Sequence, residues 1–351
     1  MKNSNNIFNS IINKGLELFV PKHIKDPRLI IRMIRSRDPS AWFAVSMFVF
    51  GILTIPWDMI FSVFERRLID NSIEPDLPII IICGVPRSGT TLVSQAVIKY
   101  LPVSYLSNLT ALFPRSPIIA NTLFRKFLNK KISFSSYYGK TVHLSGPNDA
   151  FFIWNRWLKE DSSGIKCVLR EEKADEMTQF FGAFQREFGK PLILKNNSLN
   201  TQAAPIASAL PNSYFICMTR DPIYVAQSLI NARKEIQGNL NDALWVDDPD
   251  KSGIQDGNYV EDVCNQVLYH EKKIAEQQKL IGAERFRIVR YEDFIEDPNV
   301  LLKEICDEIL EIEFNPEEPL RPFPNANKIQ VSDNEFSKIA RTIDEMKKII
   351  N

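Results

Sequence analysis

The residues best suited to chemistry lie in one short loop of the stretch LPIIIICGVPRSGTTLVSQAVIKY, residues 77–100. The loop supplies two glycines, one cation and several hydroxyls, from Gly84 through Pro86, Arg87, Ser88, Gly89, Thr90 and Thr91. The β-branched run before it predicts a strand buried on both faces, and the residues after it predict a helix. Backbone N–H groups and the positive end of the helix dipole meet in such a loop. The stretch therefore predicts a binding site for a phosphate or a similar anion.

The spacing of this loop matches the phosphate loop G-x-x-x-x-G-K-[ST] at every fixed position except one, because Thr90 stands where the lysine belongs. That lysine is the cation that reaches the β- and γ-phosphates of a nucleoside triphosphate. The positive charge lies inside the loop instead, at Arg87. The alternative to an anion site is an ordinary corner between a strand and a helix, with incidental glycines.

Four apolar segments are typical of strands: residues 79–82, 191–195, 214–219 and 285–291. Segments with helical character alternate with them, and this rhythm predicts a three-layer α/β sandwich around a central parallel sheet. In such sheets, ligands bind at the carboxyl ends of the strands. Four residues are expected at that edge: Gly84, Lys195, Arg220 and Tyr291.

Three separated motifs resemble those of sulfotransferases that use 3′-phosphoadenosine 5′-phosphosulfate (PAPS). PRSGTT after an apolar strand is similar to their 5′-phosphosulfate loop, in the form found in the carbohydrate and protein-tyrosine branches. TRDP followed by Ser228 resembles the element for the 3′-phosphate, in which Arg220 ends a strand and Ser228 lies on the next helix. YEDFIEDP resembles the third shared element, whose tyrosine, here Tyr291, lies near the adenine. The resemblance covers residues 77–310 and implies the P-loop-NTPase-like sulfotransferase fold, with PAPS as the sulfuryl donor.

Each of these assignments has a plainer alternative. A second phosphate, remote from the first loop, does need its own bidentate cation and a hydroxyl donor. Arg-Asp-Pro also occurs at helix starts for capping, because Asp221 suits the N-cap and Pro222 the first helical position. Tyr291 could equally be a core aromatic residue at the end of a strand.

The sequence departs from the cytosolic branch of the family at the place of its catalytic base. That branch carries K-T-H after a strand, whereas this chain reads Lys195-Asn196-Asn197. The C-terminal R-K-G-x-x-G element of that branch is also missing, and Lys328 is only a weak substitute for it. The base must therefore be sought elsewhere.

An acceptor hydroxyl has to lose its proton, so a carboxylate or an imidazole is expected beside it. Two candidates, Asp149 and His143, lie in the loop before the aromatic segment FFIWNRW. Related branches use an acidic residue between the two phosphate elements, which favours Asp149. Capping of the next helix is the alternative role of this residue. Lys195 and Arg87 would neutralise charge on the transferring group.

The composition limits which classes of cofactor and partner are expected. The chain of 351 residues carries 43 Lys plus Arg and 43 Asp plus Glu, so its formal charge is zero and no nucleic-acid partner is expected. No pair of cysteines and no Asp/Glu/His cluster has metal-ligand spacing, so no metal is expected either. The expected partner is a hydroxyl-bearing acceptor, such as a carbohydrate or a lipid.

Residues 1–76 are expected to form a basic and hydrophobic N-terminal segment, followed by the sulfotransferase domain at residues 77–351. Residues 41–57 are uncharged and just long enough for a membrane span, with Pro56 and Asp58 interrupting the far end. One interpretation is a single span whose basic flank stays in the cytoplasm. The other is an interfacial or self-packed hairpin. Both predict a cytoplasmic enzyme that contacts a membrane through residues 41–64.

The sequence thus predicts a PAPS-dependent sulfotransferase that makes a sulfate ester by in-line displacement. Two rival interpretations stay open. A P-loop kinase or NTPase would need the lysine that Thr90 replaces and an acid to hold magnesium. A non-catalytic, membrane-tethered nucleotide-binding module would keep the phosphate elements and lack a functioning base.

Overall fold

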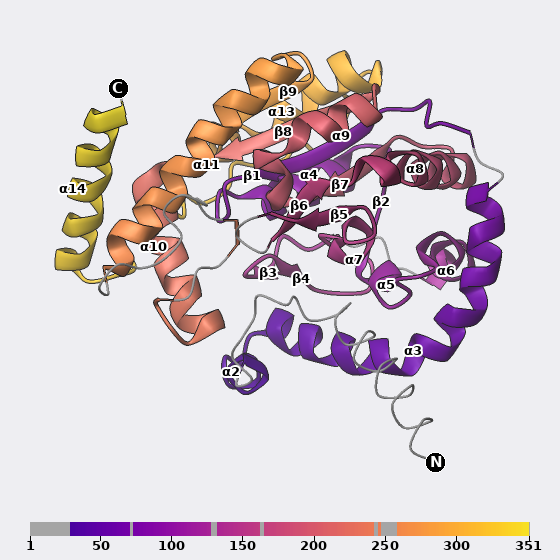
Figure 1. The fold of residues 1–351 in the computed structure, drawn as a ribbon, viewed down its shortest axis with the longest axis horizontal. Helices are drawn as coiled ribbons and strands as arrows, with labels where there is room; N and C mark the ends of the chain where they lie inside the picture. The colour runs from indigo at the N-terminus through magenta and orange to yellow at the C-terminus, as the bar shows by residue number, and fades with distance from the viewer. Residues whose placement is uncertain are drawn as a thin grey trace.

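The computed structural model describes residues 29–70, 73–127, 132–161, 165–241, 245–246 and 258–350. A five-stranded parallel sheet lies at the centre of the domain (Figure 1), with the strand order β2-β7-β1-β8-β9. The strands are β1 (Ile79–Gly84), β2 (Ser104–Tyr105), β7 (Leu192–Lys195), β8 (Ser213–Thr219) and β9 (Phe286–Arg290). Every residue of β1 is buried, as its β-branched run predicts for the central strand of a parallel sheet.

Side chains alternate between the two faces of β1, and each face packs against a different helical layer. Ile79 and Ile81 belong to the core cluster formed with α8 (Ala174–Phe188), α9 (Ala203–Ala209), α10 (Pro222–Ala232) and α11 (Tyr259–Ile281). Ile80 and Ile82 belong to the cluster formed with α4 (Thr90–Tyr100), α12 (Tyr291–Glu296) and α13 (Pro298–Ile305). The expected three-layer α/β sandwich is confirmed.

Smaller elements complete the described part of the chain. Two antiparallel hairpins pair β3 (Ser136–Tyr137) with β4 (Lys140–Thr141) and β5 (Leu158–Glu160) with β6 (Lys166–Leu169). The remaining α-helices are α2 (Leu29–Arg35), α3 (Pro39–Asp70), α5 (Asn108–Ala111), α6 (Pro117–Phe124), α7 (Phe151–Trp154) and α14 (Asp333–Ile350). Short 3-10 segments occur at Arg125–Phe127, Glu171–Lys173 and Asn197–Thr201, and π-helical turns at Arg233–Gln237 and Cys306–Leu310.

All four predicted strands are present, and the sheet has a fifth strand, β2, for which no strand was predicted. A strand of two residues is too short for a periodic signal. It exists because Ser104 and Tyr105 pair with Leu192 and Ile193 of β7, far away in the sequence. The aromatic segment that contains α7 contributes to the core, with Trp154 1% exposed.

Helix α3 is one continuous helix of 32 residues, so the hairpin predicted as one alternative for residues 41–57 is wrong. Pro56 lies inside the helix, where the missing amide favours a bend rather than an end. In Figure 1, α3 follows the lower edge of the domain and then turns up along its right-hand side. Within the described ranges it is the one helix long and apolar enough to cross a membrane.

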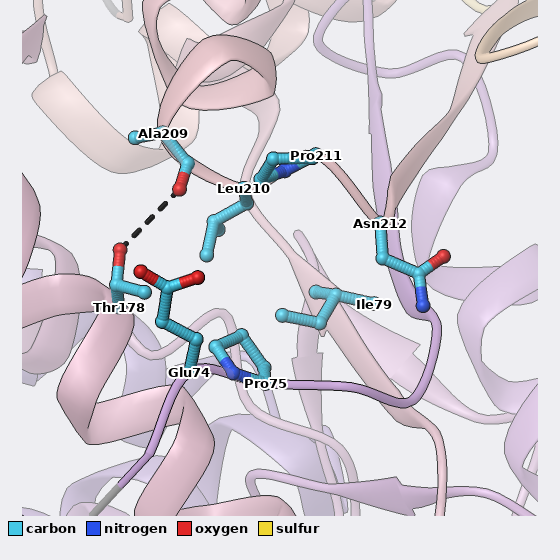
Figure 2. A pocket seen from close by; sticks show the side chains of 8 residues that line it. All are labelled: Glu74, Pro75, Ile79, Thr178, Ala209, Leu210, Pro211 and Asn212. Carbon is cyan, nitrogen blue, oxygen red and sulfur yellow. Dashed lines mark hydrogen bonds between the residues drawn. The ribbon is translucent and has the colours of Figure 1, made fainter.

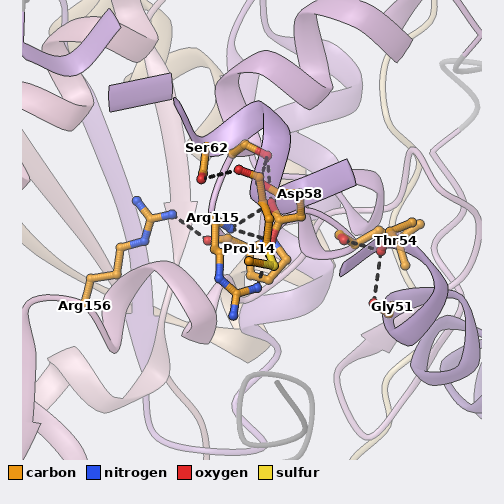
Figure 3. A network of polar contacts seen from close by, with 10 residues as sticks. Gly51, Thr54, Asp58, Ser62, Pro114, Arg115 and Arg156 are labelled. Atoms are coloured by element: carbon orange, nitrogen blue, oxygen red, sulfur yellow. Dashed lines mark hydrogen bonds and ion pairs between the residues drawn. The ribbon is translucent and has the colours of Figure 1, made fainter. Parts of the chain in front are cut away.

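Two buried carboxylates hold the inner side of α3 against the rest of the domain. Asp58 is fully buried and accepts hydrogen bonds from the Arg115 amide at 3.1 Å and from Ser116 Oγ at 2.7 Å (Figure 3). Glu65 is equally buried and accepts from two backbone amides in the first turn of α6, at 3.1 and 2.9 Å. A carboxylate at a helix N-terminus also interacts favourably with the helix dipole. These contacts fix α3 against α6.

The pocket in Figure 2 lies at the amino-terminal ends of the strands. Its lining comes from the segment that leads into β1, from α8, and from the end of α9 and the turn before β8: Glu74, Pro75, Ile79, Thr178, Ala209, Leu210, Pro211 and Asn212. Lys195 and Arg220 lie at or after the opposite ends of β7 and β8. This pocket is therefore separate from the edge at which the candidate residues gather.

Candidate active site

The loop between β1 and α4 requires glycine at two positions, because other parts of the protein pack closely against its backbone. Gly84 has a φ of 147°, and a Cβ there would lie 2.3 Å from the Met218 carbonyl oxygen. Gly89 has a φ of 91°, and a Cβ there would lie 2.7 Å from Cδ2 of Tyr291. Ser88 Oγ donates to the Met218 carbonyl at 2.9 Å, which ties the loop to β8. No side chain caps the start of α4, so its first backbone amides are available to an anion.

Arg87 lies inside this loop, with a left-handed backbone (φ 75°) and a half-buried side chain. Its Nε donates to Ser228 Oγ on α10 at 3.0 Å, and its guanidinium lies 4.8 Å from the centre of the Tyr138 ring. Burial, above all, lowers the pKa of Arg87; Tyr138 and Glu235 raise it, and the charge of Arg220 lowers it further. An anion bound near the two guanidinium groups would relieve their repulsion.

Arg220 directly follows β8, and its guanidinium reaches back to the loop. Nη1 donates to the carbonyl oxygen of Arg87 at 3.1 Å, and Nε donates to Asn327 Oδ1 at 2.7 Å. The guanidinium lies 4.7 Å from the centre of the Tyr291 ring, whose hydroxyl accepts from the Ala326 amide at 3.2 Å. The structure thus brings the three sequence motifs together at the carboxyl edge of the sheet.

The plainer roles considered for this region coexist with these contacts. Asp221 Oδ1 accepts from the Ile223 amide at 2.9 Å, and Pro222 begins α10, so the Arg-Asp-Pro run does cap a helix. Tyr291 is a buried member of the core as well as a neighbour of Arg220. Capping and burial position these residues and leave the guanidinium of Arg220 directed at the loop.

Lys195, the last residue of β7, forms an ion pair with Asp149, in which Nζ donates to Oδ1. The Lys195 side chain is 5% exposed and that of Asp149 is 21% exposed, so the carboxylate keeps some access to solvent. The β3–β4 hairpin lies over this pair, because a Cβ on Gly139 would lie 3.6 Å from Thr91 Oγ1 and 3.9 Å from Lys195 Nζ. Lys140 adds a second, exposed cation, whose charge is favoured by the nearby Asp149 and disfavoured by Lys195.

The Asp149 carboxylate does not cap the following helix. Ala150 is the N-cap of α7, and its amide donates to Asn148 Oδ1 at 2.9 Å. Asn108 supports the loop from the core, because its Nδ2 donates to the His143 carbonyl at 2.9 Å and its Oδ1 accepts from Asn148 Nδ2 at 2.8 Å. A network of uncharged groups therefore holds the loop that presents Asp149.

The ring of His143 lies apart from this arrangement. The residue is exposed and has a left-handed backbone with a φ of 68°. No hydrogen bond or ion pair joins its ring to another residue that the structure describes. The structure brings Asp149, rather than His143, into contact with Lys195.

Sequence reasoning missed the β3–β4 hairpin, which contributes Tyr138 and Lys140 to the site. Gly139 between aromatic and basic residues is a turn signal, but strands of two residues give no alternation to support it. It also missed Asn108, since a buried asparagine far from the motifs has no distinguishing pattern. Lys328 is exposed, and its carbonyl accepts from Gln227 Nε2 at 2.7 Å, next to Ser228.

Two polar atoms just beyond Lys195 are consistent with a bound ligand. Asn196 Nδ2 and Asn197 Oδ1 are buried and have no hydrogen-bond partner within the described part of the chain. Buried polar atoms are rarely left unpaired, so a ligand or a water is expected to contact them.

Comparisons with known proteins identify the family and the fold of the chain. A profile of the sulfotransferase family matches residues 78–316, more than half of the chain, whereas no curated protein sequence matches it. The solved structure of sulfotransferase STF9 from Mycobacterium avium aligns over 95% of this chain and 96% of its own, with 15% identity and a TM-score of 0.52. Sulfotransferase STF1 from Mycobacterium tuberculosis H37Rv aligns over 90% and 84%, with 12% identity and a TM-score of 0.48. The likeness to STF9 supports the fold, and the profile match shows that the chain belongs to the sulfotransferase family.

Proposed function

We propose that this enzyme takes its sulfuryl group from PAPS and transfers it to a hydroxyl of a carbohydrate, a lipid or a similar acceptor. The observation that carries the proposal is the convergence of two anion-binding elements. Arg87 in the loop donates a hydrogen bond to Ser228 on α10, and Arg220 donates one to the loop backbone. A nucleotide with phosphates on both its 5′ and 3′ oxygens needs two such elements side by side.

The donor would lie across the carboxyl edge of the sheet. Its 5′-phosphosulfate would contact the loop and the start of α4, formed by Pro86, Arg87, Ser88, Gly89, Thr90 and Thr91. Arg220 and Ser228 would hold the 3′-phosphate, and Tyr291 would lie beside the adenine. When bound, PAPS supplies an activated sulfuryl group whose leaving group is adenosine 3′,5′-bisphosphate.

Asp149 is the proposed base, because its carboxylate is presented beside Lys195 and keeps access to solvent. It would take the proton of the acceptor hydroxyl as the oxygen attacks sulfur in line. Lys195 orients this carboxylate, and Lys195, Lys140 and Arg87 would stabilise negative charge on the transferring group and the leaving oxygen. His143 is the competing candidate, and its exposed ring lacks any partner to orient it among the described residues.

We also propose a cytoplasmic enzyme that contacts a membrane through residues 41–64. The support is the exposed apolar surface of α3, which carries several large side chains, among them Phe50, Leu53 and Trp57. Contact of this kind would suit an acceptor that is itself embedded in a membrane.

Calorimetry with three nucleotides tests the donor assignment. Adenosine 3′,5′-bisphosphate should bind at least about tenfold more tightly than 5′-AMP, because only the bisphosphate has a 3′-phosphate to contact Arg220. ATP with magnesium should bind more weakly than the bisphosphate. If ATP with magnesium binds most tightly, a kinase or NTPase is favoured. Equal affinities for the bisphosphate and 5′-AMP would contradict the proposed site for the 3′-phosphate.

A further inference from the structure

The outer face of α3 is apolar, while its carboxylates point into the protein. Asp58 and Glu65 lie one heptad apart on the inner face, where both are buried and hydrogen-bonded. Large exposed apolar side chains line the opposite side, among them Phe50, Leu53, Trp57, Ile60, Val63 and Phe64. A helix at a water-facing surface has the reverse arrangement, with polar groups outward.

We propose that this outer face of α3 enters the headgroup and upper acyl region of one leaflet of an anionic bilayer without crossing it. The inference deepens the membrane contact proposed above, and it does not depend on the sulfuryl chemistry. Soluble monomers rarely expose a contiguous apolar patch of this extent to water. An interfacial helix buries such a patch at the boundary between headgroups and acyl chains.

The surroundings of the patch favour lipid over a second copy of the chain. Arg35, Arg37 and Arg66 are exposed near its two ends, where they can meet anionic headgroups. The apolar surface continues onto α2, where Ile30 and Ile34 are exposed as well. Trp57 is exposed as well, and membrane interfaces favour tryptophan because its apolar ring carries a polar N–H.

A full membrane span conflicts with the way α3 is held. Thr54 Oγ1 donates to the Leu112 carbonyl at 2.6 Å, and the Asp58 and Glu65 contacts anchor the second half of the helix. The first end of α3 follows α2, and α2 is held to the domain by Arg32, whose Nε donates to the Glu235 carbonyl at 2.6 Å. Both ends of α3 are therefore attached to the same domain. The two ends of a membrane span, in contrast, lie on opposite sides of a hydrocarbon core about 30 Å thick. The curved course of α3 in Figure 1 agrees with this.

The inner side of α3, opposite the apolar face, adjoins the candidate active site. Ser40 Oγ, in the first turn of α3, lies 3.5 Å from Ser135 Oγ, next to β3. Helix α3 also packs against β3 and β4, the hairpin that carries Gly139 and Lys140 over Lys195. Docking through α3 would therefore hold the acceptor side of the site close to the lipid surface.

Vesicle binding by the full-length chain tests this inference. The wild type should co-sediment with vesicles that contain phosphatidylglycerol, and less with pure phosphatidylcholine. The double variant Leu53→Gln/Ile60→Gln should bind the vesicles more weakly by at least about tenfold, because two exposed apolar side chains are lost. Leu280→Gln removes an equally exposed leucine on α11 and should bind like the wild type.

All three proteins should bind adenosine 3′,5′-bisphosphate equally, which separates a failure of docking from a failure of the nucleotide site. Equal vesicle binding by the double variant and Leu280→Gln, or no binding by the wild type, would overturn the inference. A dimer in sedimentation velocity that the double variant abolishes, without vesicle binding, would assign the face to a second copy. Resistance of the full chain to carbonate extraction from cell membranes would contradict the non-crossing arrangement.

Discussion

Arg87 Nε donates to Ser228 Oγ at 3.0 Å across 141 positions of sequence. This bond joins the loop after β1 to helix α10, so the two elements proposed to bind the phosphates of the nucleotide are in direct contact. Arg220 completes it from the end of β8 by donating to the Arg87 carbonyl. In the proposed binding mode Arg220 contacts the 3′-phosphate, so its loss should affect that end of the nucleotide more than the other.

Replacing Arg220 with Ala should weaken the binding of adenosine 3′,5′-bisphosphate by roughly 1.5–3 kcal/mol, the usual cost of a charge-assisted hydrogen bond. Binding of 5′-AMP, which lacks the 3′-phosphate, should change far less. Arg290→Ala is a matched control, because Arg290 is nearby and its side chain is 63% exposed. Calorimetry that finds the same loss for both nucleotides would mean that Arg220 does not contact the 3′-phosphate.

Gly89→Ala should destabilise the protein and weaken nucleotide binding by about tenfold or more, ~1.4 kcal/mol. The new Cβ would lie 2.7 Å from Cδ2 of the buried Tyr291, and φ is 91°. Gly189→Ala is the control for backbone strain alone, because its φ is 59° and nothing lies within 4 Å of a Cβ there. We expect it to cost about 1–2 kcal/mol of stability and to leave binding unchanged. Equal effects of the two variants on binding would argue against a tight fit at Gly89.

Local features of the fold and of the site could be predicted from the sequence. Strand β1, the glycine-bounded loop and the cap of α10 follow from patterns a few residues long, and all are present. The pairing of Lys195 with Asp149 joins residues 46 positions apart, and Arg220 meets Asn327 across 107 positions. No periodicity or motif reports such contacts, because they arise only when the sheet and its loops assemble.

The orientation of α3 could not be predicted for a related reason. Its sequence is apolar on every side for much of its length, so composition alone indicates membrane contact without saying which face makes it. Burial of Asp58 and Glu65 against α6 decides which face is inward. That choice depends on Ser116 and the amides of α6, which lie more than fifty positions later in the sequence.

Glu65 should make the protein less stable as the pH rises from 4.5 to 7. Burial raises the pKa of its carboxyl from 4.5 to about 7, against the lowering effects of two backbone amides and Arg156; Asp58 adds to the rise. The folded state therefore binds the proton more tightly than the unfolded state, and the free energy of unfolding falls across this window by about 3 kcal/mol at most.

Urea unfolding of the wild type and of Glu65→Gln, at pH values from 5 to 8, measures this contribution. As the pH rises, the free energy of unfolding of the wild type should fall relative to that of Glu65→Gln. A difference that stays constant with pH would mean that Glu65 titrates normally in the folded protein.

Asp149→Asn should lower turnover by roughly 10²–10⁴-fold with nearly unchanged affinity for adenosine 3′,5′-bisphosphate. The amide keeps the size of the side chain and removes the proton acceptor, and no helix cap is lost. His143→Gln should cost far less, because that ring is exposed and unpaired within the described ranges. A silent Asp149→Asn beside an inactive His143→Gln would transfer the role of base to the histidine.

The most direct test of the central claim is the transfer of radiolabelled sulfuryl from PAPS to carbohydrate and lipid extracts of the source cells, with EDTA present. Labelled acceptor should form at an undiminished rate in EDTA, because Arg87, Lys195 and Lys140 supply the positive charge at the site. Formation should fall sharply with Arg220→Ala at limiting PAPS. Intact binding of adenosine 3′,5′-bisphosphate without any labelled acceptor would indicate a non-catalytic module, and activity that requires magnesium would contradict the account.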